Sequence, residues 1–278
     1  MLDKFYTNHK VAERCVGWLG ESVPITERTR FIEPSAGDGD FLRCLPSQRT
    51  RAIDLMPTGA GIERADFFAW KAPKSWDRRH TITIGNPPFG NRGRLAVDFF
   101  NKAAADSNTV AFIVPMNFRK YFIHKQLNDD FRLVSQHGLP FGSFHLPSGK
   151  PYNVNTEFQV WTRNETRRRD LRLRTPPKTW HPDFRLYQYN NTREAEKVFK
   201  NRFDFAVPCQ GYQDYTRRVK NADKCERNVQ WMLIAAKDSC VRKRLWNFDF
   251  GDLAHRIATV TPGFRKNDLV TAYVGGSV

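Results

Sequence analysis

Residues 31–41 of this 278-residue chain read Phe-Ile-Glu-Pro-Ser-Ala-Gly-Asp-Gly-Asp-Phe, and this stretch decides the predicted fold. A short apolar run followed by a glycine-rich turn predicts a strand, a tight loop and the start of a helix. The two glycines allow the backbone to approach a ligand closely. The loop lacks the third glycine of the G-x-G-x-x-G pattern, and the acidic Asp38 and Asp40 would repel a pyrophosphate. A ligand with a positive centre and an amino-acid tail therefore fits this loop better than a dinucleotide.

The next two motifs carry acidic residues suited to a nucleoside. Residues 51–54 predict a second strand that ends in Asp54, 15 positions after Gly39. A carboxylate at the end of the second strand of a doubly wound sheet can accept from both ribose hydroxyls. In Asp66-Phe67, the aspartate can accept from an adenine amino group while the phenylalanine packs on the ring. The alternatives are a turn or helix-capping residue for Asp54, and a loop aspartate beside core aromatics for Asp66.

Asn86-Pro87-Pro88-Phe89 follows the stretch 80–85, whose alternating branched residues predict a buried strand. The prolines remove two backbone donors and restrict φ, so the strand must end in a stiff loop. Two acceptors remain, the side-chain oxygen of Asn86 and the carbonyl of Pro87, and Phe89 can lie against a flat ring. This arrangement suits a planar amine held for attack on an electrophilic methyl group. The alternative is a proline-rich turn without a chemical role.

Over about the first 160 residues these motifs resemble those of the S-adenosylmethionine-dependent amino-methyltransferases that make N6-methyladenine in DNA. Their order is similar to that of class γ, although Asn8 stands where this class often has proline. The segment Asp3-Lys4-Phe5-Tyr6-Thr7 resembles the one that folds over the methionine end of the cofactor. The resemblance implies a Rossmann-like doubly wound α/β sheet with a terminal antiparallel hairpin, and S-adenosyl-L-methionine as the cofactor.

The resemblance also implies the site residues. Those expected to bind the cofactor are Phe5, Tyr6, Thr7, Glu33, Pro34, Ala36, Gly37, Asp38, Gly39, Asp54, Leu55, Asp66, Phe67 and Asn86. Those expected to be catalytic are Asn86, Pro87, Pro88 and Phe89. Adenine N6 is a poor nucleophile, so Asn86 and the Pro87 carbonyl would accept its two hydrogens in a direct transfer to a flipped base, with Phe89 stacked on the ring. Neither a metal ion nor a covalent nucleophile is expected.

The charge of the chain predicts a polyanionic partner. Forty-five basic against 29 acidic residues give a net charge of +16, which attracts nucleic acids. Residues 1–163 hold 22 basic and 16 acidic residues, a net charge of +6. Residues 164–278 hold 23 basic and 13 acidic residues, a net charge of +10. We therefore expect DNA as the partner, with RNA as an alternative, and no membrane, since no apolar run approaches the ~20 residues of a membrane span. A generally basic surface without a binding role is the alternative.

Strand and helix patterns alternate up to about residue 163 and predict two domains. Residues 1–163 form the expected methyltransferase domain, and residues 164–278 form an expected smaller, basic α+β region that binds nucleic acid and recognises the target. In the first domain the pattern predicts helices at 11–19 and 94–104, a central strand at 109–114 and a terminal hairpin at 131–137 and 156–161. In the second it predicts helices at 192–202, 238–246 and 252–259, and a buried strand or short helix at 229–236.

Two segments are candidates for nucleic-acid contacts. Residues 142–155 are rich in Gly, Pro and Asn and predict a mobile loop. In the family that the chain resembles, a loop near this place borders the flipped base, so the resemblance implies that Phe144 or Tyr152 stacks on the base and that Lys150 meets a phosphate. Residues 210–218 mix aromatics, amides and arginines, and Arg217 and Arg218 suit bidentate phosphate contact. The alternatives are a surface hairpin loop and a solvated turn. We expect a short or relaxed sequence preference, because no long helix with clustered amide and arginine side chains is evident.

Five cysteines, an odd number without a C-x-x-C pair, predict a reducing cytoplasmic location and no zinc site. Three other functions remain open: an adenine-N6 RNA methyltransferase, a protein-glutamine methyltransferase, whose fourth tetrad position is usually Tyr, and a non-catalytic nucleic-acid-binding module. The sequence leaves the oligomeric state and the target sequence undetermined.

Overall fold

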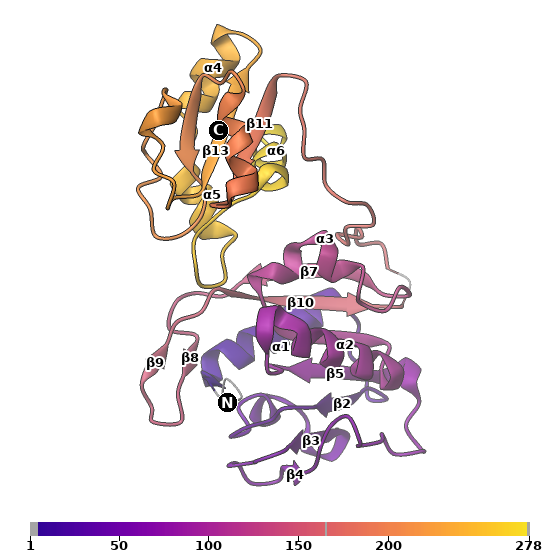
Figure 1. Cartoon of the computed structure of the whole chain (residues 1–278). Helices are drawn as coiled ribbons and strands as arrows, with labels where there is room; N and C mark the ends of the chain where they lie inside the picture. Colours follow the sequence, from indigo (N-terminus) through magenta and orange to yellow (C-terminus); the bar gives the residue numbers. More distant parts are fainter. Residues whose placement is uncertain (1–4, 165, 277–278) are drawn as a thin grey trace. The chain divides into compact units, whose positions relative to one another are not determined.

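A seven-stranded sheet in the order β4-β3-β2-β5-β6-β10-β7 organises the N-terminal part of this computed structural model (Figure 1). The structure describes residues 5–164 and 166–276. The sheet strands are β2 (Arg30–Glu33), β3 (Thr50–Asp54), β4 (Glu63–Arg64), β5 (Thr81–Gly85), β6 (Thr109–Pro115), β7 (Arg132–Gly138) and β10 (Thr156–Thr162). Strands β4, β3, β2, β5 and β6 pair in parallel, and β10 pairs antiparallel with both β6 and β7. The predicted doubly wound sheet with a terminal antiparallel hairpin is confirmed.

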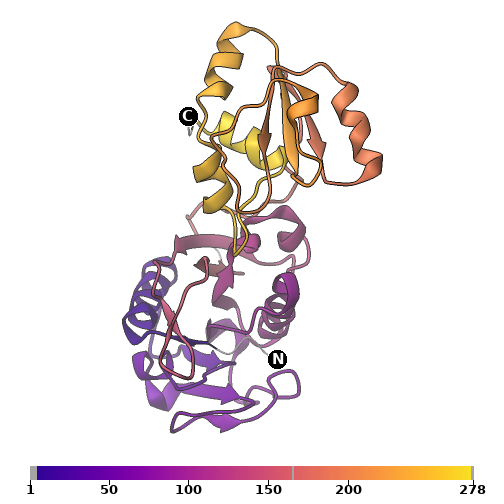
Figure 2. The same cartoon turned by 60° about the vertical axis from the view of Figure 1, so that its left-hand side comes forward.

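The central strands are apolar because helices cover both faces of the sheet. Every residue of β5 and β6 is buried, as expected for parallel strands between two helical layers. Helix α1 (His9–Ser22) lies on one face and α2 (Arg94–Asp106) on the other (Figure 2). Both helices confirm the predicted segments and extend them by a few residues. The short 3₁₀ helices η3 (Arg78–His80), η4 (Asn91–Gly93) and η5 (Met116–Arg119), and helix α3 (Tyr121–His124), connect the strands.

The expected helix after the 31–41 loop does not form. Only two 3₁₀ turns follow, η1 (Leu42–Cys44) and η2 (Ser47–Arg49). Pro46 disfavours helical geometry in the residue before it, and Leu45 is extended, with φ −116° and ψ 153°. The crossover from β2 to β3 is therefore short.

The segment 142–155, expected to be a mobile loop, instead forms a hairpin that holds the N-terminal strand. Its strands β8 (Phe144–His145) and β9 (Pro151–Tyr152) join β1 (Tyr6–Thr7) in a three-stranded antiparallel sheet of order β1-β8-β9. The sequence pattern hid this pairing, since each strand has only two residues and its partner lies far along the chain. Asp3 and Lys4 of the N-terminal motif lie outside the described residues.

The structure divides after Arg174, 11 residues beyond the expected 163/164 boundary and within the charged stretch 163–177 that ends in Thr-Pro-Pro, and this gives the compact units Met1–Arg174 and Thr175–Val278. The intervening segment belongs to the first unit because its side chains bond there. Asp170 accepts from the backbone N–H of Leu133 at 3.1 Å. The guanidinium of Arg172 donates to a ring of main-chain carbonyls, those of His124, Leu127, Asn128 and Phe131.

The second unit has the predicted α+β composition. Its antiparallel sheet, in the order β11-β13-β12, consists of β11 (Phe184–Tyr189), β12 (Phe205–Pro208) and β13 (Trp231–Ala236). Its helices are α4 (Ser239–Trp246), α5 (Phe250–Arg256) and α6 (Lys266–Val274), with 3₁₀ helices η6 (Arg193–Lys200) and η7 (Ala222–Lys224). Strands β11 and β12 and helix α6 were not predicted.

Candidate active site

The strand order of the first unit changes direction between β2 and β5, where doubly wound sheets bind ligands. The loops that leave the carboxyl ends of β2, β3, β4 and β5 meet there around a cavity of about 520 Å³, a size typical of ligand sites. The residues that line it are Phe5, Tyr6, Pro34, Ser35, Gly37, Asp54, Leu55, Met56, Ala65, Asp66, Phe67, Phe68, Asn86, Pro87, Pro88, Leu95 and Phe99.

Asp54 is fixed at the wall of this cavity by two backbone N–H groups. One carboxylate oxygen accepts from Gly37 N and the other from Met56 N, both at 2.8 Å. A carboxylate has about four acceptor positions, so each oxygen keeps capacity for a ligand hydroxyl. The structure thus orients the predicted ribose-binding residue toward the 31–41 loop without using up its acceptors.

An aromatic wall lies beside Asp66. The side chain of Asp66 accepts from Phe68 N at 2.9 Å, which closes a tight turn after β4. Phe67, the predicted ring-packing residue, is only 2% exposed, whereas Phe68 is 44% exposed. Both rings contact Phe99 of α2, with centroid distances of 5.4 and 5.0 Å. Phe68 is therefore the more accessible surface for a planar ring.

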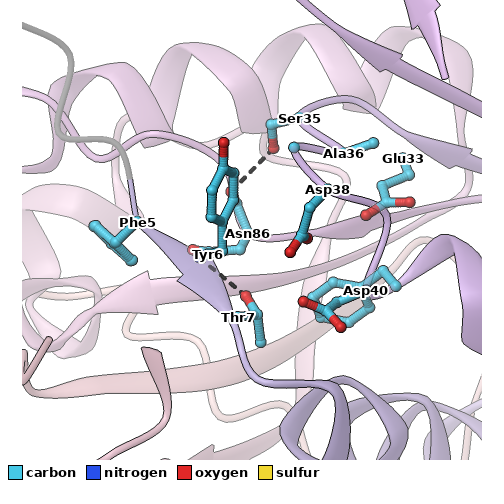
Figure 3. A pocket seen from close by; sticks show the side chains of 11 residues that line it. Phe5, Tyr6, Thr7, Glu33, Ser35, Ala36, Asp38, Asp40 and Asn86 are labelled. Carbon is cyan, nitrogen blue, oxygen red and sulfur yellow. Dashed lines mark hydrogen bonds between the residues drawn. The ribbon is translucent and has the colours of Figure 1, made fainter. Parts of the chain in front are cut away.

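A smaller pocket of about 20 Å³ adjoins the cavity and is lined by three carboxylates, Glu33, Asp38 and Asp40 (Figure 3). Glu33 is 1% exposed, and its Oε2 has no hydrogen-bond partner among the described residues. Burial, followed by the charges of Asp40 and Asp38, raises the pKa of Glu33 well above its ordinary value. Burial and Asp40 also raise the pKa of Asp38. A pocket that concentrates three carboxylates in this way favours a cation.

The metal-ligating atoms of Asp38, Asp40 and His145 lie within 4.8 Å of one another. This is the one group of three such residues that the described part of the chain brings together, and its spacing could hold a metal ion. Arg43 forms an ion pair with Asp40 and offsets part of the negative charge. Exposed acidic groups often lie this close without an ion, so this spacing alone assigns no metal.

The N-terminal strand β1 covers the 31–41 loop. The ring of Tyr6 packs so closely on Gly37 that a Cβ at this glycine would lie 2.8 Å from two ring carbons. Gly37 also has a φ of +56°. Both the close contact with Tyr6 and the positive φ therefore require glycine at this position. Thr7 and Ser35 both bond to Asn86: its side-chain Nδ2 donates to Thr7 Oγ1 at 3.2 Å, and its carbonyl accepts from Ser35 Oγ at 3.0 Å (Figure 3).

Asn86 presents an unpaired acceptor at the point where the two pockets meet. Its Oδ1 is buried and has no hydrogen-bond partner among the residues that the structure describes. Asn86 lines both pockets, and Pro87 and Pro88 continue the wall of the larger one. A buried polar atom without a partner is costly unless a ligand or water satisfies it, which marks this oxygen as a ligand contact.

Phe89, expected to stack on a flat acceptor, is 6% exposed and lines neither pocket. Its ring packs against Phe5 with a centroid distance of 5.4 Å. Phe144 and Tyr152, expected to stack on the base, also contact Phe5, at 4.9 and 5.0 Å. These four rings form one cluster, so the structure places the three predicted stacking residues against Phe5. Lys150 is exposed at the tip of the hairpin.

The two arginines expected to contact phosphate in the second unit are occupied by the protein. Arg218 donates to the carbonyls of Tyr215, Trp246 and Phe248 at 2.8–3.0 Å. The Nη2 of Arg217 donates to both carboxylate oxygens of Glu226, at 2.8 and 3.0 Å. The sequence pattern could not distinguish guanidinium groups exposed to solvent from guanidinium groups that form hydrogen bonds within the protein.

The structure brings together most of the predicted cofactor residues, and adds others that sequence reasoning missed. The additional lining residues are Ser35, Asp40, Phe41, Met56, Ala65, Phe68, Leu95 and Phe99. Leu95 and Phe99 are four residues apart in α2, so they lie on the same face of the helix. Because a helix was predicted directly after the tetrad, this spacing could have identified both as lining residues. Gly39 lines neither pocket, but its φ of +90° shapes the loop.

No protein-family model matches the chain, and no curated protein is significantly similar to it. Similar solved structures include the 23S rRNA methyltransferase ErmE, at 15% identity and a TM-score of 0.40, over 58% of this chain and 70% of that one. A type I restriction-modification methyltransferase subunit from Streptococcus thermophilus matches at 15% identity and 0.43, over 59% and 47%. The M protein of the type I restriction enzyme EcoKI matches at 15% and 0.41, over 59% and 44%.

This chain therefore spans less than half the length of these two restriction-system proteins. Similarities at this level assign neither an activity nor a substrate to this chain. None of the described helices is long and apolar enough to cross a membrane.

Proposed function

We propose that this protein transfers a methyl group from S-adenosyl-L-methionine to the exocyclic N6 of adenine in DNA. The observation that carries the proposal is the buried, unpartnered Oδ1 of Asn86 at the junction of an acidic pocket and a larger, aromatic-walled cavity. An acceptor oxygen in this position suits an amino group that enters from the larger cavity. The motif Asn86-Pro87-Pro88-Phe89 adds the rigid turn that holds the oxygen in place.

The residues present fit the cofactor at both of its ends. The acidic pocket, with the orphaned Oε2 of Glu33, suits an ammonium group, and the fixed carboxylate of Asp54 suits ribose hydroxyls. Asp66 and the exposed ring of Phe68 suit an adenine, through its amino group and its face. S-Adenosyl-L-methionine, when bound, would supply an electrophilic methyl group on its sulfonium sulfur, and the bond to sulfur would break to release a neutral thioether, a good leaving group.

The tetrad would act on the acceptor by position and electrostatics. The lone pair of an aromatic amine is delocalised into its ring, so the amine becomes nucleophilic only as its nitrogen moves toward tetrahedral geometry. Asn86 Oδ1 and the carbonyl of Pro87 would accept its two hydrogens and stabilise this change, and these bonds would strengthen in the transition state. Thr7 holds the amide of Asn86 by its Nδ2, which leaves Oδ1 as the free acceptor.

A polynucleotide acceptor is supported by the charge of the chain. The net charge of +16 attracts a polyanion and is a poor match for a protein-glutamine acceptor. A base in a duplex must leave the stack to reach Asn86, at a cost of a few kcal/mol. We propose that the second unit binds the backbone of the nucleic acid, with a short or relaxed sequence preference.

The test is incubation of the purified chain with methyl-labelled cofactor and, separately, a DNA duplex, single-stranded DNA and RNA of matching sequence. Digestion and mass spectrometry of the nucleosides should find N6-methyladenine in DNA with the wild type and none with Asn86→Ala. Label confined to RNA would reassign the acceptor, and label found in protein glutamine would replace the proposed function. Absence of label from every acceptor, together with absence of cofactor binding by calorimetry, would remove the enzymatic assignment.

A further inference from the structure

The loop that follows the tetrad holds an arginine in a strained backbone conformation. Arg92 has φ 54° and ψ 28°, in the left-handed region, between Gly90 at φ 65° and Gly93 at φ 78°. A side chain larger than Asn or Asp rarely adopts this conformation, because its Cβ approaches the backbone too closely. Such strain persists only where the surrounding structure enforces it, and it is concentrated at functional sites.

Asn117, in the 3₁₀ helix η5, holds the backbone of this loop. Its Nδ2 donates to the carbonyl of Arg92 at 2.6 Å. A Cβ on Gly93 would lie 2.9 Å from the same Nδ2 and 3.0 Å from Oδ1, so only glycine fits beside the amide. The backbone of the loop is therefore held at Arg92 itself.

The residues on either side of this loop line the larger cavity, into which Asn86 also projects. Pro88 and Leu95, which flank it in sequence, both line the cavity. Leu95 is also tied back to the tetrad, since its backbone N–H donates to the Phe89 carbonyl at 3.1 Å. Arg92 lies between these two wall residues in sequence, six positions after Asn86, and is not itself one of the residues that line the cavity.

The guanidinium of Arg92 is unoccupied. Arg92 and the nearby Arg94 are exposed, and within residues 5–164 and 166–276 neither side chain has a hydrogen-bond, ion-pair or ring partner. This distinguishes them from Arg217 and Arg218, whose guanidiniums bond to the protein. A planar fork with five free donors suits a phosphodiester.

We propose that Arg92 binds a backbone phosphate next to the acceptor nucleotide, and that the strained loop exists to present it. The inference rests on the proposed function for the acceptor class, a polynucleotide, but concerns a residue that the motifs do not include. The phosphodiester is common to DNA and RNA, so the experiment uses both.

The structure offers variants that separate binding from folding. Arg92→Gly removes the guanidinium and places glycine at a positive φ that it tolerates, so its melting temperature should equal or exceed that of the wild type. Arg92→Lys keeps the positive charge and loses the planar set of guanidinium donors. Arg28→Ala is the matched control, since Arg28 is exposed, has no side-chain partner among the described residues and precedes β2, at the opposite edge of the sheet from the cavity.

Titration of DNA and RNA oligonucleotides over a range of salt concentrations gives the readout. Arg92→Gly should weaken binding of all sequences roughly tenfold, with Arg92→Lys in between. It should also flatten the slope of log K against log salt by about 0.7–0.9, the value for one lost phosphate contact. Affinity for S-adenosyl-L-methionine should not change, and Arg28→Ala should leave both slope and affinity close to the wild type.

An unchanged salt slope in Arg92→Gly, or an equal loss in Arg28→Ala, would overturn the assignment of Arg92. If the wild type binds nucleic acid in an Arg92-dependent way but transfers no methyl group, the proposed reaction fails while the phosphate site stands. If the wild type binds neither DNA nor RNA, both proposals fail.

Discussion

The loop at Asn86–Phe89 and the loop at Asp214–Arg218 both carried functional motifs in the sequence, yet the structure treats them oppositely. At the first, a buried acceptor oxygen of Asn86 is left without a partner among the described residues. At the second, Arg218 donates to several carbonyls and Arg217 pairs with Glu226. The difference teaches that a motif indicates a binding site where its polar groups remain available, and a structural element where the fold has already used them.

The sharpest test of this comparison is Asn86→Ala. If Oδ1 acts in the transition state, the transfer rate constant should fall by roughly 10²–10³. Thermal stability should change little, because the lost contact is one hydrogen bond to Thr7, worth about 1 kcal/mol. Stopped-flow or single-turnover kinetics and calorimetric melting check the two halves.

Asn101→Ala is the matched control for that experiment. Both polar atoms of Asn101 are used, by the carbonyl of Gln126 and the N–H of Asn128. We expect loss of stability with little change in rate. Equal rate losses in the two variants would mean that Asn86 has no special role.

Arg218→Ala should mainly destabilise the second unit. Its removal leaves part-buried carbonyls without donors, at a cost of about 2–3 kcal/mol. Urea unfolding followed by the tryptophans of this unit should show an earlier transition. A stable variant with a flattened salt dependence of nucleic-acid binding would instead return Arg218 to the nucleic-acid interface.

Glu33→Gln tests the acidic pocket through pH. The pKa of Glu33 is raised by burial, by Asp40 and by Asp38, so the folded state holds the proton more tightly than the unfolded state does. The contribution of Glu33 to stability is then complete below its ordinary pKa of 4.5 and is lost as pH rises through the raised pKa. Glutamine should raise stability at pH 8 and change it little near pH 4.

The same variant should weaken cofactor binding at pH 8, because the charge opposite the ammonium is lost. Melting curves and calorimetry at the two pH values separate these effects. A variant that is less stable than the wild type at pH 8 would show that the carboxylate is already neutralised within the protein.

Arg217→Ala should have the smallest effect. Its ion pair with Glu226 is largely solvent-exposed, and such pairs contribute about 0–1 kcal/mol. Denaturation in low and high salt should give nearly the same midpoint as the wild type. A loss as large as that of Arg218→Ala would show that the stacking of Arg217 on Trp231, at 5.1 Å, carries more of the stability than the ion pair.

The order of strands and turns in the first unit could be predicted from the sequence, because each of these local patterns depends only on residues that are neighbours in the chain. The apolar runs of β5 and β6, the stop imposed by Pro87 and Pro88, and the turn glycine Gly37 all follow from periodicity and backbone restriction. These elements determined the doubly wound sheet and put Glu33, Asp54 and Asn86 at the carboxyl ends of its strands.

Tertiary structure alone decided which polar groups stay free. The pairing of β1 with β8 packs Phe144 and Tyr152 on Phe5, the carbonyls near Trp246 and Phe248 take up Arg218, and Asn117 strains Arg92 into its exposed position. Each of these contacts joins residues far apart in the chain, so no local pattern encodes it. The sequence by itself determined where chemistry could occur, and long-range packing decided which side chains remained available for it.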